Sequence, residues 1–450
     1  MSSASATWDV AIVGAGIVGL ALARELQRRD PHRRVIVLER EPAVAAHQTS
    51  HSSGVLHAGI YYPPGSLKAR ACVRGRALLE EHCARHGIPV ERCGKLIVAR
   101  HDGERAALDE LERRGRANGV PGLRRLEGPA AIAEFEPHAT GVAALHSPAT
   151  GICDFAAVAR ALAADVVAAG GAVQTGFAVA ALRRDAGPGG AVTLVADHPG
   201  ARPVGADARG GRASGGEARP PRPGDRARPG APPAQDSVRA RRIVGCAGLW
   251  SDRLAVLDGA DADPRIVPFR GGYLRLADEA TALVRGLIYP VPDPSLPFLG
   301  VHLTRTVHGE LWLGPTALLV GRRDGYRLRR AWRPGGGELR ATLGWPGTWR
   351  VGRRWWRTAL DEAATAARPE RLLRAAAAYV PALRPEHVAA GPHPAGVRAQ
   401  AVGRDGTLVD DFRIDETPAG LHVRNAPSPA ATSSLALAEL LADRVAALDR

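Results

Sequence analysis

The chain has 450 residues, of which 45% are apolar, and a formal net charge of +14 at pH 7. This length predicts two domains, and the apolar share supports a packed core, which excludes a wholly disordered or fibrous protein. Arginine supplies 58 of the 60 basic residues, and the only lysines are Lys68 and Lys95. This bias is typical of GC-rich coding sequence. The positive charge is therefore explained equally well by genomic composition and by selection for binding an anionic partner.

The five cysteines are scattered and form neither a CxxC motif nor a cluster with histidine. We therefore expect reduced thiols, no metal site and no disulfide framework. The first apolar run, residues 10–23, is too short to span a bilayer, and no later run reaches 18 apolar residues. These features predict a cytoplasmic protein, or one bound peripherally to the inner face of the cytoplasmic membrane.

Hydrophobic periodicity predicts a strand over residues 9–13, a helix over 17–29 and a strand over 35–38, which together form a βαβ unit. Residues 266–320 alternate short strands and turns, a pattern typical of an antiparallel sheet. Further strands are expected over 93–99, 172–182 and 191–196, and a strand that runs into a glycine turn over 242–248. Further helices are expected over 66–86, 104–118, 154–169, 358–378 and from Pro429 to the C-terminus.

Residues 197–237 interrupt this pattern with proline, glycine, alanine, arginine and aspartate and almost no large apolar side chain. Such a segment cannot bury enough surface to offset the entropy lost on ordering. We predict a disordered insertion between two strands, without a catalytic role.

A GxGxxG motif, residues 14–19, lies between the first predicted strand and helix, and Glu39 ends the next strand. The glycines allow a tight turn, backbone approach to a pyrophosphate and close helix packing, while the helix N-terminus stabilises phosphate charge. An acidic residue at the strand end accepts hydrogen bonds from ribose hydroxyls. A fortuitous turn is the weaker alternative. The motif predicts a dinucleotide site, for NAD or FAD, at Gly14, Gly16, Ile17, Val18, Gly19, Glu39 and Arg40.

Two later segments favour FAD. Residues 244–251 form a strand and a turn of small residues that contains Gly248, and residues 423–432 lead from a strand into the last helix. A helix N-terminus aimed at the flavin would stabilise negative charge on the reduced ring. In the second segment the predicted cofactor contacts are Pro427, Ser428, Ala430, Ala431 and Thr432.

Residues 47–62 follow Glu39 closely and contain three histidines and two tyrosines among small residues. We expect His57 to take the hydroxyl proton of a substrate as hydride leaves carbon. The alternative is that His57 only hydrogen-bonds the backbone or the flavin. Small residues let the backbone approach a planar ring, and the predicted cofactor contacts are Thr49, Ser50, Ser53, Gly54 and Val55.

At residues 49–68, 93–99 and 425–434 the chain closely resembles the L-2-hydroxyglutarate dehydrogenase/oxidase family of D-amino-acid-oxidase-like flavoproteins. The resemblance extends over nearly the whole chain apart from 197–237, with further similar stretches at 267–273, 299–304 and 396–400. It implies oxidation of L-2-hydroxyglutarate to 2-oxoglutarate by hydride transfer to flavin N5, with electrons passed to a quinone-like acceptor or oxygen. Gly272 stands where the family often has an acid.

We expect an α/β fold, with a Rossmann-like FAD-binding domain of the glutathione-reductase type and an inserted antiparallel-sheet substrate domain. The FAD-binding domain is predicted to be discontinuous, and the substrate domain to include a basic segment rich in tryptophan. The predicted boundaries are 1–92, 151–262 and 396–450 for the first, and 93–150 and 263–395 for the second.

A dicarboxylate substrate needs two cationic or donor clusters, and a guanidinium matches a carboxylate. Arg270 and Arg398 are the candidates, and an ordinary structural ion pair is the alternative for each. We expect His57, Arg270 and His302 to be catalytic, and Tyr62, Arg398 and Lys95 to bind substrate.

Residues 322–357 contain eleven arginines, two acids and five of the eight tryptophans. This composition suits docking on an anionic membrane, where a quinone would be met, and equally suits a helical lid with tryptophan in its core. No nucleic-acid motif accompanies the charge, so we expect no nucleic-acid partner.

Two rival functions remain open from the sequence. One is an amino-acid, amine or glycerol-3-phosphate oxidase on the same scaffold. The other is a flavin-free protein that kept the fold and binds membranes or nucleic acid.

Overall fold

The computed structural model describes residues 7–185, 190–197, 237–293, 296, 298–332 and 337–449. The predicted insertion at 197–237 lies outside these residues except for its two ends. In the described parts of the chain, the helices are all too short or too polar to cross a bilayer. All five cysteines are free thiols.

The largest sheet contains the predicted βαβ unit. Strand β1 (Trp8–Val13) pairs in parallel with β2 (Val35–Leu38) on one side and with β12 (Ser237–Gly245) on the other. Beyond β2 lies β9 (Ala172–Gln174), and beyond β12 lies β21 (Gly420–Asn425), both also parallel. Chain segments far apart in sequence are therefore neighbours in this sheet. Its antiparallel strands are β10 (Val179–Arg184), β11 (Val192–Ala196) and β20 (Arg413–Thr417).

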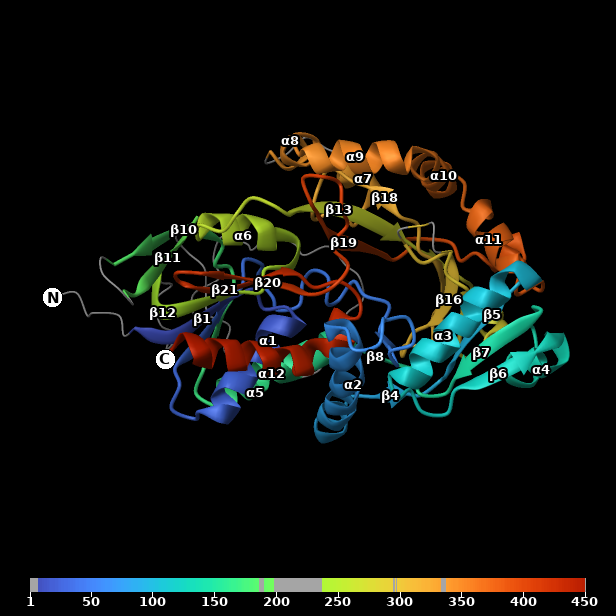
Figure 1. The fold of residues 1–450 in the computed structure, drawn as a ribbon, viewed down its shortest axis with the longest axis horizontal. Helices are drawn as coiled ribbons and strands as arrows, with labels where there is room; N and C mark the ends of the chain where they lie inside the picture. Colours follow the sequence, from blue (N-terminus) through green and yellow to red (C-terminus); the bar gives the residue numbers. More distant parts are fainter. Residues whose placement is uncertain are drawn as a thin grey trace, which may run out of the picture.

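Four helices pack together beside this sheet (Figure 1): α1 (Ile17–Arg29), α2 (Leu67–Arg85), α5 (Phe155–Ala168) and α12 (Ala430–Leu448). Their apolar faces and the inner strands form one buried core, in which Leu20, Val37, Leu162 and Leu437 are fully buried. Burial of this surface supplies the main stabilisation of the parallel sheet, whose strands are apolar on both faces.

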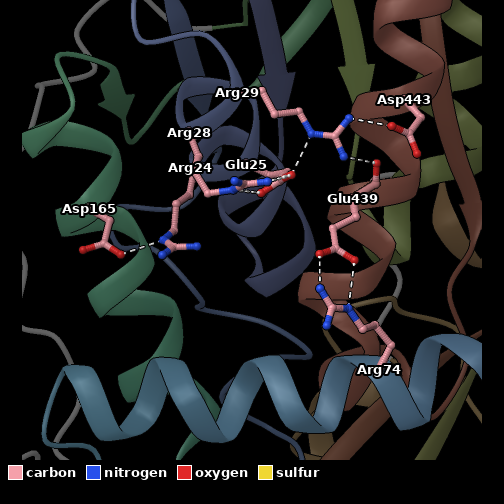
Figure 2. A network of polar contacts seen from close by, with 8 residues as sticks. All are labelled: Arg24, Glu25, Arg28, Arg29, Arg74, Asp165, Glu439 and Asp443. Atoms are coloured by element: carbon pink, nitrogen blue, oxygen red, sulfur yellow. Dashed lines mark hydrogen bonds and ion pairs between the residues drawn. The ribbon is translucent and has the colours of Figure 1, made fainter.

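Ion pairs join the same helices at their outer surfaces (Figure 2). Arg24 of α1 pairs with Asp165 of α5 (Nε–Oδ2 2.9 Å), and Arg29 pairs with Asp443 of α12 (2.6 Å). Arg74 of α2 pairs with Glu439 (3.0 Å). All three pairs remain accessible to water, although Arg24 and Asp165 are half-buried, and such pairs contribute about 1 kcal/mol or less each.

Among the described residues, one group brings three metal-ligand side chains within 4.8 Å of one another, namely His82, His86 and Asp165. The Asp165 oxygen nearest the histidines also accepts the Arg24 hydrogen bond. We therefore assign this group to the ion-pair network.

A second sheet, shown at the right of Figure 1, brings together two distant parts of the chain. One part supplies β5 (Lys95–Ala99), β6 (Arg124–Glu127) and β7 (Ala143–Ser147). The other supplies β14 (Leu274–Arg275), β15 (Leu287–Pro290), β16 (His302–Arg305) and β17 (Leu311–Gly314). All its pairings are antiparallel except that of β15 with β5. Its faces are covered by α3 (Arg105–Ala117), α4 (Gly128–Phe135) and α11 (Glu370–Ala377).

Two small sheets lie between the large ones. The first contains β18 (Leu318–Leu319), β13 (Arg265–Gly272) and β19 (Ala395–Val402) in that order, and both pairings are antiparallel. The second orders β3 (Val55–Leu56), β8 (Gly151–Cys153) and β4 (Val90–Glu91). Above the first sheet run α7 (Leu328–Ala331), α8 (Glu338–Leu343), α9 (Pro346–Arg354) and α10 (Trp356–Ala367), along the upper edge of Figure 1.

Two predicted elements are wrong in extent. The strand expected over 172–182 is two strands, β9 and β10, separated at Gly176, whose positive φ of 71° turns the chain. The helix expected over 358–378 is broken between α10 and α11 at Pro369, because proline disfavours helical geometry in the residue before it.

Candidate active site

The turn after β1 has no room for side chains at two of its glycines. Gly14 has φ +112°, and a Cβ there would collide with the Cys246 carbonyl oxygen of the neighbouring strand. A Cβ on Gly19 would collide with the Gly14 carbonyl oxygen. These contacts hold the N-terminus of α1 against the end of β1, where its free amides can meet a phosphate group.

Glu39 is 7% exposed and accepts two backbone hydrogen bonds, from Ala15 N (2.8 Å) and Glu41 N (3.0 Å). Burial raises the pKa of Glu39, and these hydrogen bonds oppose the shift. Each carboxylate oxygen keeps a second lone pair for a ribose hydroxyl. Thr49 Oγ1 accepts from Ile17 N (3.1 Å), which fixes the 47–62 segment against α1.

A cavity of about 830 Å³ extends from this turn, within the roughly 300–1,000 Å³ typical of ligand sites. The predicted cofactor residues that line it are Gly14, Gly16, Ile17, Val18, Glu39, Arg40, Thr49, Ser53, Gly54, Val55, Gly248, Ser428, Ala430, Ala431 and Thr432. The three segments on which the FAD prediction rested therefore meet in one space. An elongated dinucleotide fits this lining, with Glu39 at a ribose, the N-terminus of α1 at the central pyrophosphate and the start of α12 at the far end.

Three predicted cofactor residues do not line the cavity. Gly19 lies behind the turn, in contact with Gly14. Ser50 is exposed, because the turn at 47–51 directs its hydroxyl outward to donate to the His47 carbonyl (3.2 Å). Pro427 uses its carbonyl to accept from Ala430 N (2.9 Å), so it shapes the start of α12.

Sequence reasoning missed part of the lining. Trp250 lies under the Arg40 guanidinium, 4.2 Å from the ring centre to Cζ, and it closes one side of the cavity. Trp250 stands in a segment already singled out for its glycines, so its position could have been inferred. Phe177, in the β9–β10 connection, and Val179, the first residue of β10, also line the cavity, and no local motif marks them.

His57 lines the cavity at the α12 end. Its Nε2 lies 3.4 Å from Ser428 Oγ, and its backbone N donates to Thr432 Oγ1 (3.1 Å). Burial lowers the pKa of His57 well below its usual value, and the charges of Lys95, His302 and Lys68 lower it further. A neutral imidazole results, which can accept a proton.

Lys95 and His302 stack on one aromatic ring beyond His57. Lys95 Nζ lies 3.9 Å from the ring centre of Tyr289, and the His302 ring stacks on the same tyrosine at 3.9 Å. Burial lowers the pKa of Lys95 to about 7 and that of His302 to about 3. Both side chains are at most 5% exposed, so their charge states depend on what binds beside them.

Arg398 joins this group, whereas Arg270 does not. The Arg398 guanidinium lies over the Phe298 ring (4.3 Å), and its charge contributes to lowering the pKa of His302. In the β13–β19 ladder Arg398 is paired with Phe269, and Arg270 is paired with Val397. Because cross-strand partners share a face and neighbours alternate, the two arginines start from opposite faces of the sheet. This differs from the expectation of two converging arginines, and Arg270 Nε donates to the Tyr326 carbonyl (2.9 Å).

Tyr62 is 7% exposed with Ser428 near its hydroxyl, and burial raises the pKa of that hydroxyl well above the usual value. Lys68 Nζ lies 5.4 Å from the Tyr62 ring centre. Lys68 and Tyr289 were not predicted as site residues. The sequence offered one clue to Lys68, which is one of only two lysines in the chain. Nothing local marked Tyr289, which reaches the site through the parallel pairing of β15 with β5.

Comparison with known proteins identifies the family. The model of the FAD dependent oxidoreductase family, DAO, matches residues 9–444. The chain is 42% identical to the mitochondrial L-2-hydroxyglutarate dehydrogenase of Nematostella vectensis, over 98% of the chain and 90% of that protein. It is 40% identical to the Homo sapiens protein of the same name (99% and 90% covered). It is 37% identical to the L-2-hydroxyglutarate dehydrogenase of Indibacter alkaliphilus (96% of each).

Solved structures agree on the fold. The L-alpha-glycerophosphate oxidase of Mycoplasma pneumoniae, with FAD bound, superposes with a TM-score of 0.72 at 21% identity, over 99% of this chain and 95% of that one. The glycine oxidase of Geobacillus kaustophilus gives 0.64 at 20% identity, over 98% and 95%. The predicted fold and FAD cofactor are thereby confirmed. This chain belongs to the FAD-dependent oxidoreductase family and, within it, to the family of L-2-hydroxyglutarate dehydrogenases.

Proposed function

We propose that this protein oxidises L-2-hydroxyglutarate to 2-oxoglutarate. The observation that carries the proposal is the position of His57, at the point where the cofactor cavity meets two cationic side chains, the buried Lys95 and the half-buried Arg398. The names of the relatives support the same substrate. When bound, FAD supplies the acceptor for the hydride that leaves C2 of the hydroxy acid.

The protein's own residues supply binding, orientation and proton transfer. Neutral His57 accepts the substrate hydroxyl proton at Nε2, and in the complex the substrate hydroxyl replaces Ser428 Oγ as the hydrogen-bond partner of that nitrogen. Lys95 and Arg398 bind a carboxylate, and binding of an anion stabilises the protonated form of Lys95. His302 stacks on the same tyrosine as Lys95, Tyr62 lies near Ser428, and we assign to both a hydrogen bond to the substrate.

Arg270 keeps a supporting role in this proposal. Its guanidinium holds the Tyr326 carbonyl, and the Tyr326 ring stacks on His51 at 3.8 Å. The contact connects the 47–62 segment to the basic segment 322–357. We therefore assign Arg270 to positioning, although the sequence indicated a direct contact with substrate.

We also propose that the electrons pass to a quinone-like acceptor at a membrane that the segment 322–357 contacts peripherally. Trp345 is a core residue, 2% exposed, whose Nε1 donates to the Val402 carbonyl (2.9 Å). By contrast, Trp349 is 64% exposed and Trp356 is 53% exposed, on helices that also carry arginines. Exposed tryptophan beside arginine favours an anionic bilayer surface, such as the inner face of the cytoplasmic membrane.

A substrate panel tests the activity. The FAD-loaded protein is mixed anaerobically with L-2-hydroxyglutarate, glycerol 3-phosphate, glycine and L-proline, and flavin absorbance is followed. Only the hydroxy acid should bleach the flavin, and bleaching by another member alone would refute the substrate. For the membrane contact, flotation with anionic vesicles should be lost in Trp349→Ser/Trp356→Ser, and equal flotation of this variant would refute it.

A further inference from the structure

Both lysines of the chain are buried near His57. Lys68 is 6% exposed and Lys95 is 2% exposed, although every other basic residue is arginine. Burial is the largest cause of the lowered pKa of His57, and the charges of both lysines lower that pKa further. Lysine is seldom buried without an anionic partner, because removing an ammonium from water is costly. The Lys95 ammonium contacts the rings of Tyr61 and Tyr289, so an anionic ligand is the partner that its burial calls for, whereas Lys68 already pairs with a carboxylate of the protein.

A chain of contacts leads from Lys68 to the base. Lys68 is the second residue of α2, and its Nζ lies over the Tyr62 ring. Ser428 lies near the Tyr62 hydroxyl, and its Oγ is 3.4 Å from His57 Nε2.

Lys95 reaches the neighbouring tyrosine from a different element. From β5, its Nζ lies 5.3 Å from the ring centre of Tyr61. The two ammonium groups therefore contact adjacent tyrosines, one ammonium from α2 and the other from the second sheet. They provide two separate positive poles for a ligand.

The protein partner of Lys68 is a solvated carboxylate. Lys68 Nζ donates to Asp410 Oδ1 at 2.9 Å, and the Asp410 side chain is 84% exposed. Asp410 belongs to the connection between β19 and β20. An exposed carboxylate gains little from such a pair, since water competes for it. A carboxylate that arrives with the substrate can therefore replace Asp410 at small cost.

We propose that Lys68 forms the subsite for the second carboxylate of the substrate, which displaces Asp410, while Lys95 and Arg398 bind the carboxylate next to the reacting carbon. This inference rests on the proposed function and names Lys68 as the residue that makes the enzyme specific for a dicarboxylate. The enzyme should therefore prefer dicarboxylic to monocarboxylic 2-hydroxy acids. A methyl group in place of the second carboxylate cannot displace Asp410, so Lys68 stays paired with Asp410 and does not contact that substrate.

The first test is the Lys68→Met variant with two substrates of equal chain length, L-2-hydroxyglutarate and L-2-hydroxypentanoate. Loss of one charge-assisted hydrogen bond should lower kcat/KM for the dicarboxylate about 10- to 100-fold. The value for the monocarboxylate should stay within about threefold, since that substrate never meets Lys68. Arg70→Met is the matched control: it removes an exposed cation from the same helix and should change neither substrate appreciably.

Asp410→Asn separates ligand exchange from a structural ion pair. If Asp410 competes with the substrate, its removal should raise kcat/KM for the dicarboxylate about two- to fivefold. If the pair only holds the loop in place, Asp410→Asn should lower activity as Lys68→Met does, which would overturn the inference. This variant retains Lys68, so it stays decisive even if Lys68→Met fails to load FAD.

Ligand binding gives a readout independent of turnover. Calorimetric titration of the FAD-loaded protein with glutarate and with pentanoate should show tighter binding of glutarate, and Lys68→Met should remove most of that difference. An unchanged preference in Lys68→Met refutes the subsite. If the wild-type flavin is not reduced by L-2-hydroxyglutarate, the proposed function fails instead, and the glutarate titration still tests Lys68 by itself.

Discussion

The imidazole of His57 lies beside the hydroxyl of Ser428, with Nε2 3.4 Å from Oγ, although the two residues are 371 positions apart in the sequence. The contact joins the histidine-rich segment after β2 to the start of α12. It places a neutral base at the edge of the cofactor cavity. In the proposed reaction, proton transfer depends on this position.

His57→Gln should retain FAD but reduce its flavin slowly. Loss of a positioned general base lowers a rate by about 10²- to 10⁴-fold. Anaerobic stopped-flow measurement of flavin absorbance gives this rate directly. Ser428→Ala, which only removes the orienting hydroxyl, should have a much smaller effect. A near-normal rate in His57→Gln would remove the base assignment.

Substrate binding should weaken as pH rises above 7. The pKa of Lys95 is lowered to about 7 by burial, so its ammonium is present below pH 7 and lost above it. His57, whose pKa is lowered well below its usual value, stays neutral through this range. Since kcat/KM reports the free enzyme, its profile for L-2-hydroxyglutarate should fall above about pH 7. In Lys95→Met, kcat/KM should be low and independent of pH in this range. If kcat/KM of this variant still falls above pH 7, the titrating group is not Lys95.

Gly14→Ala should abolish FAD binding and destabilise the fold. The residue has φ +112°, and a Cβ would collide with the Cys246 carbonyl oxygen. Gly65→Ala is a matched control, with φ +78° but no atom within 4 Å of the added Cβ. The control should cost only about 1 kcal/mol and keep FAD. Flavin content and the melting temperature measure both effects, and equal behaviour of the two variants would contradict the steric argument.

Arg323→Met should destabilise the protein by about 3–5 kcal/mol, because it leaves a buried carboxylate unpaired. Arg323 and Asp252 have side chains that are 4% and 5% exposed, with Nη2 2.9 Å from Oδ2. Burial raises the pKa of Asp252, but pairing with Arg323 outweighs it and the net shift is downward. Urea unfolding measures the loss. Arg371→Met, whose partner Asp361 is 64% exposed, should lose less than about 1 kcal/mol, and equal losses would show that burial is unimportant.

The parts of the site that could be predicted are those built from local sequence. The turn at 14–19 and the start of α12 each combine a strand, small residues and a helix N-terminus within one stretch, and Glu39 directly follows β2 of the same βαβ unit. Their geometry follows from backbone requirements at particular glycines, such as Gly14. The sequence therefore indicated a dinucleotide, and the three segments together indicated a flavin.

The remaining contacts depend on how strands pair across the chain. Arg270 and Arg398 are each plausible carboxylate ligands, but the register of β13 against β19 places them on opposite faces. Tyr289 joins Lys95 only because β15 pairs in parallel with β5. A one-residue change of register would reverse every face, and no single stretch of sequence encodes it.

A single-turnover experiment tests the central claim most directly. The FAD-loaded protein is titrated anaerobically with L-2-hydroxyglutarate, and flavin bleaching and 2-oxoglutarate are both measured. The account predicts one 2-oxoglutarate for each flavin reduced, and no bleaching by the D enantiomer under the same conditions. Failure of the L enantiomer to reduce the flavin, or bleaching without formation of 2-oxoglutarate, would contradict it.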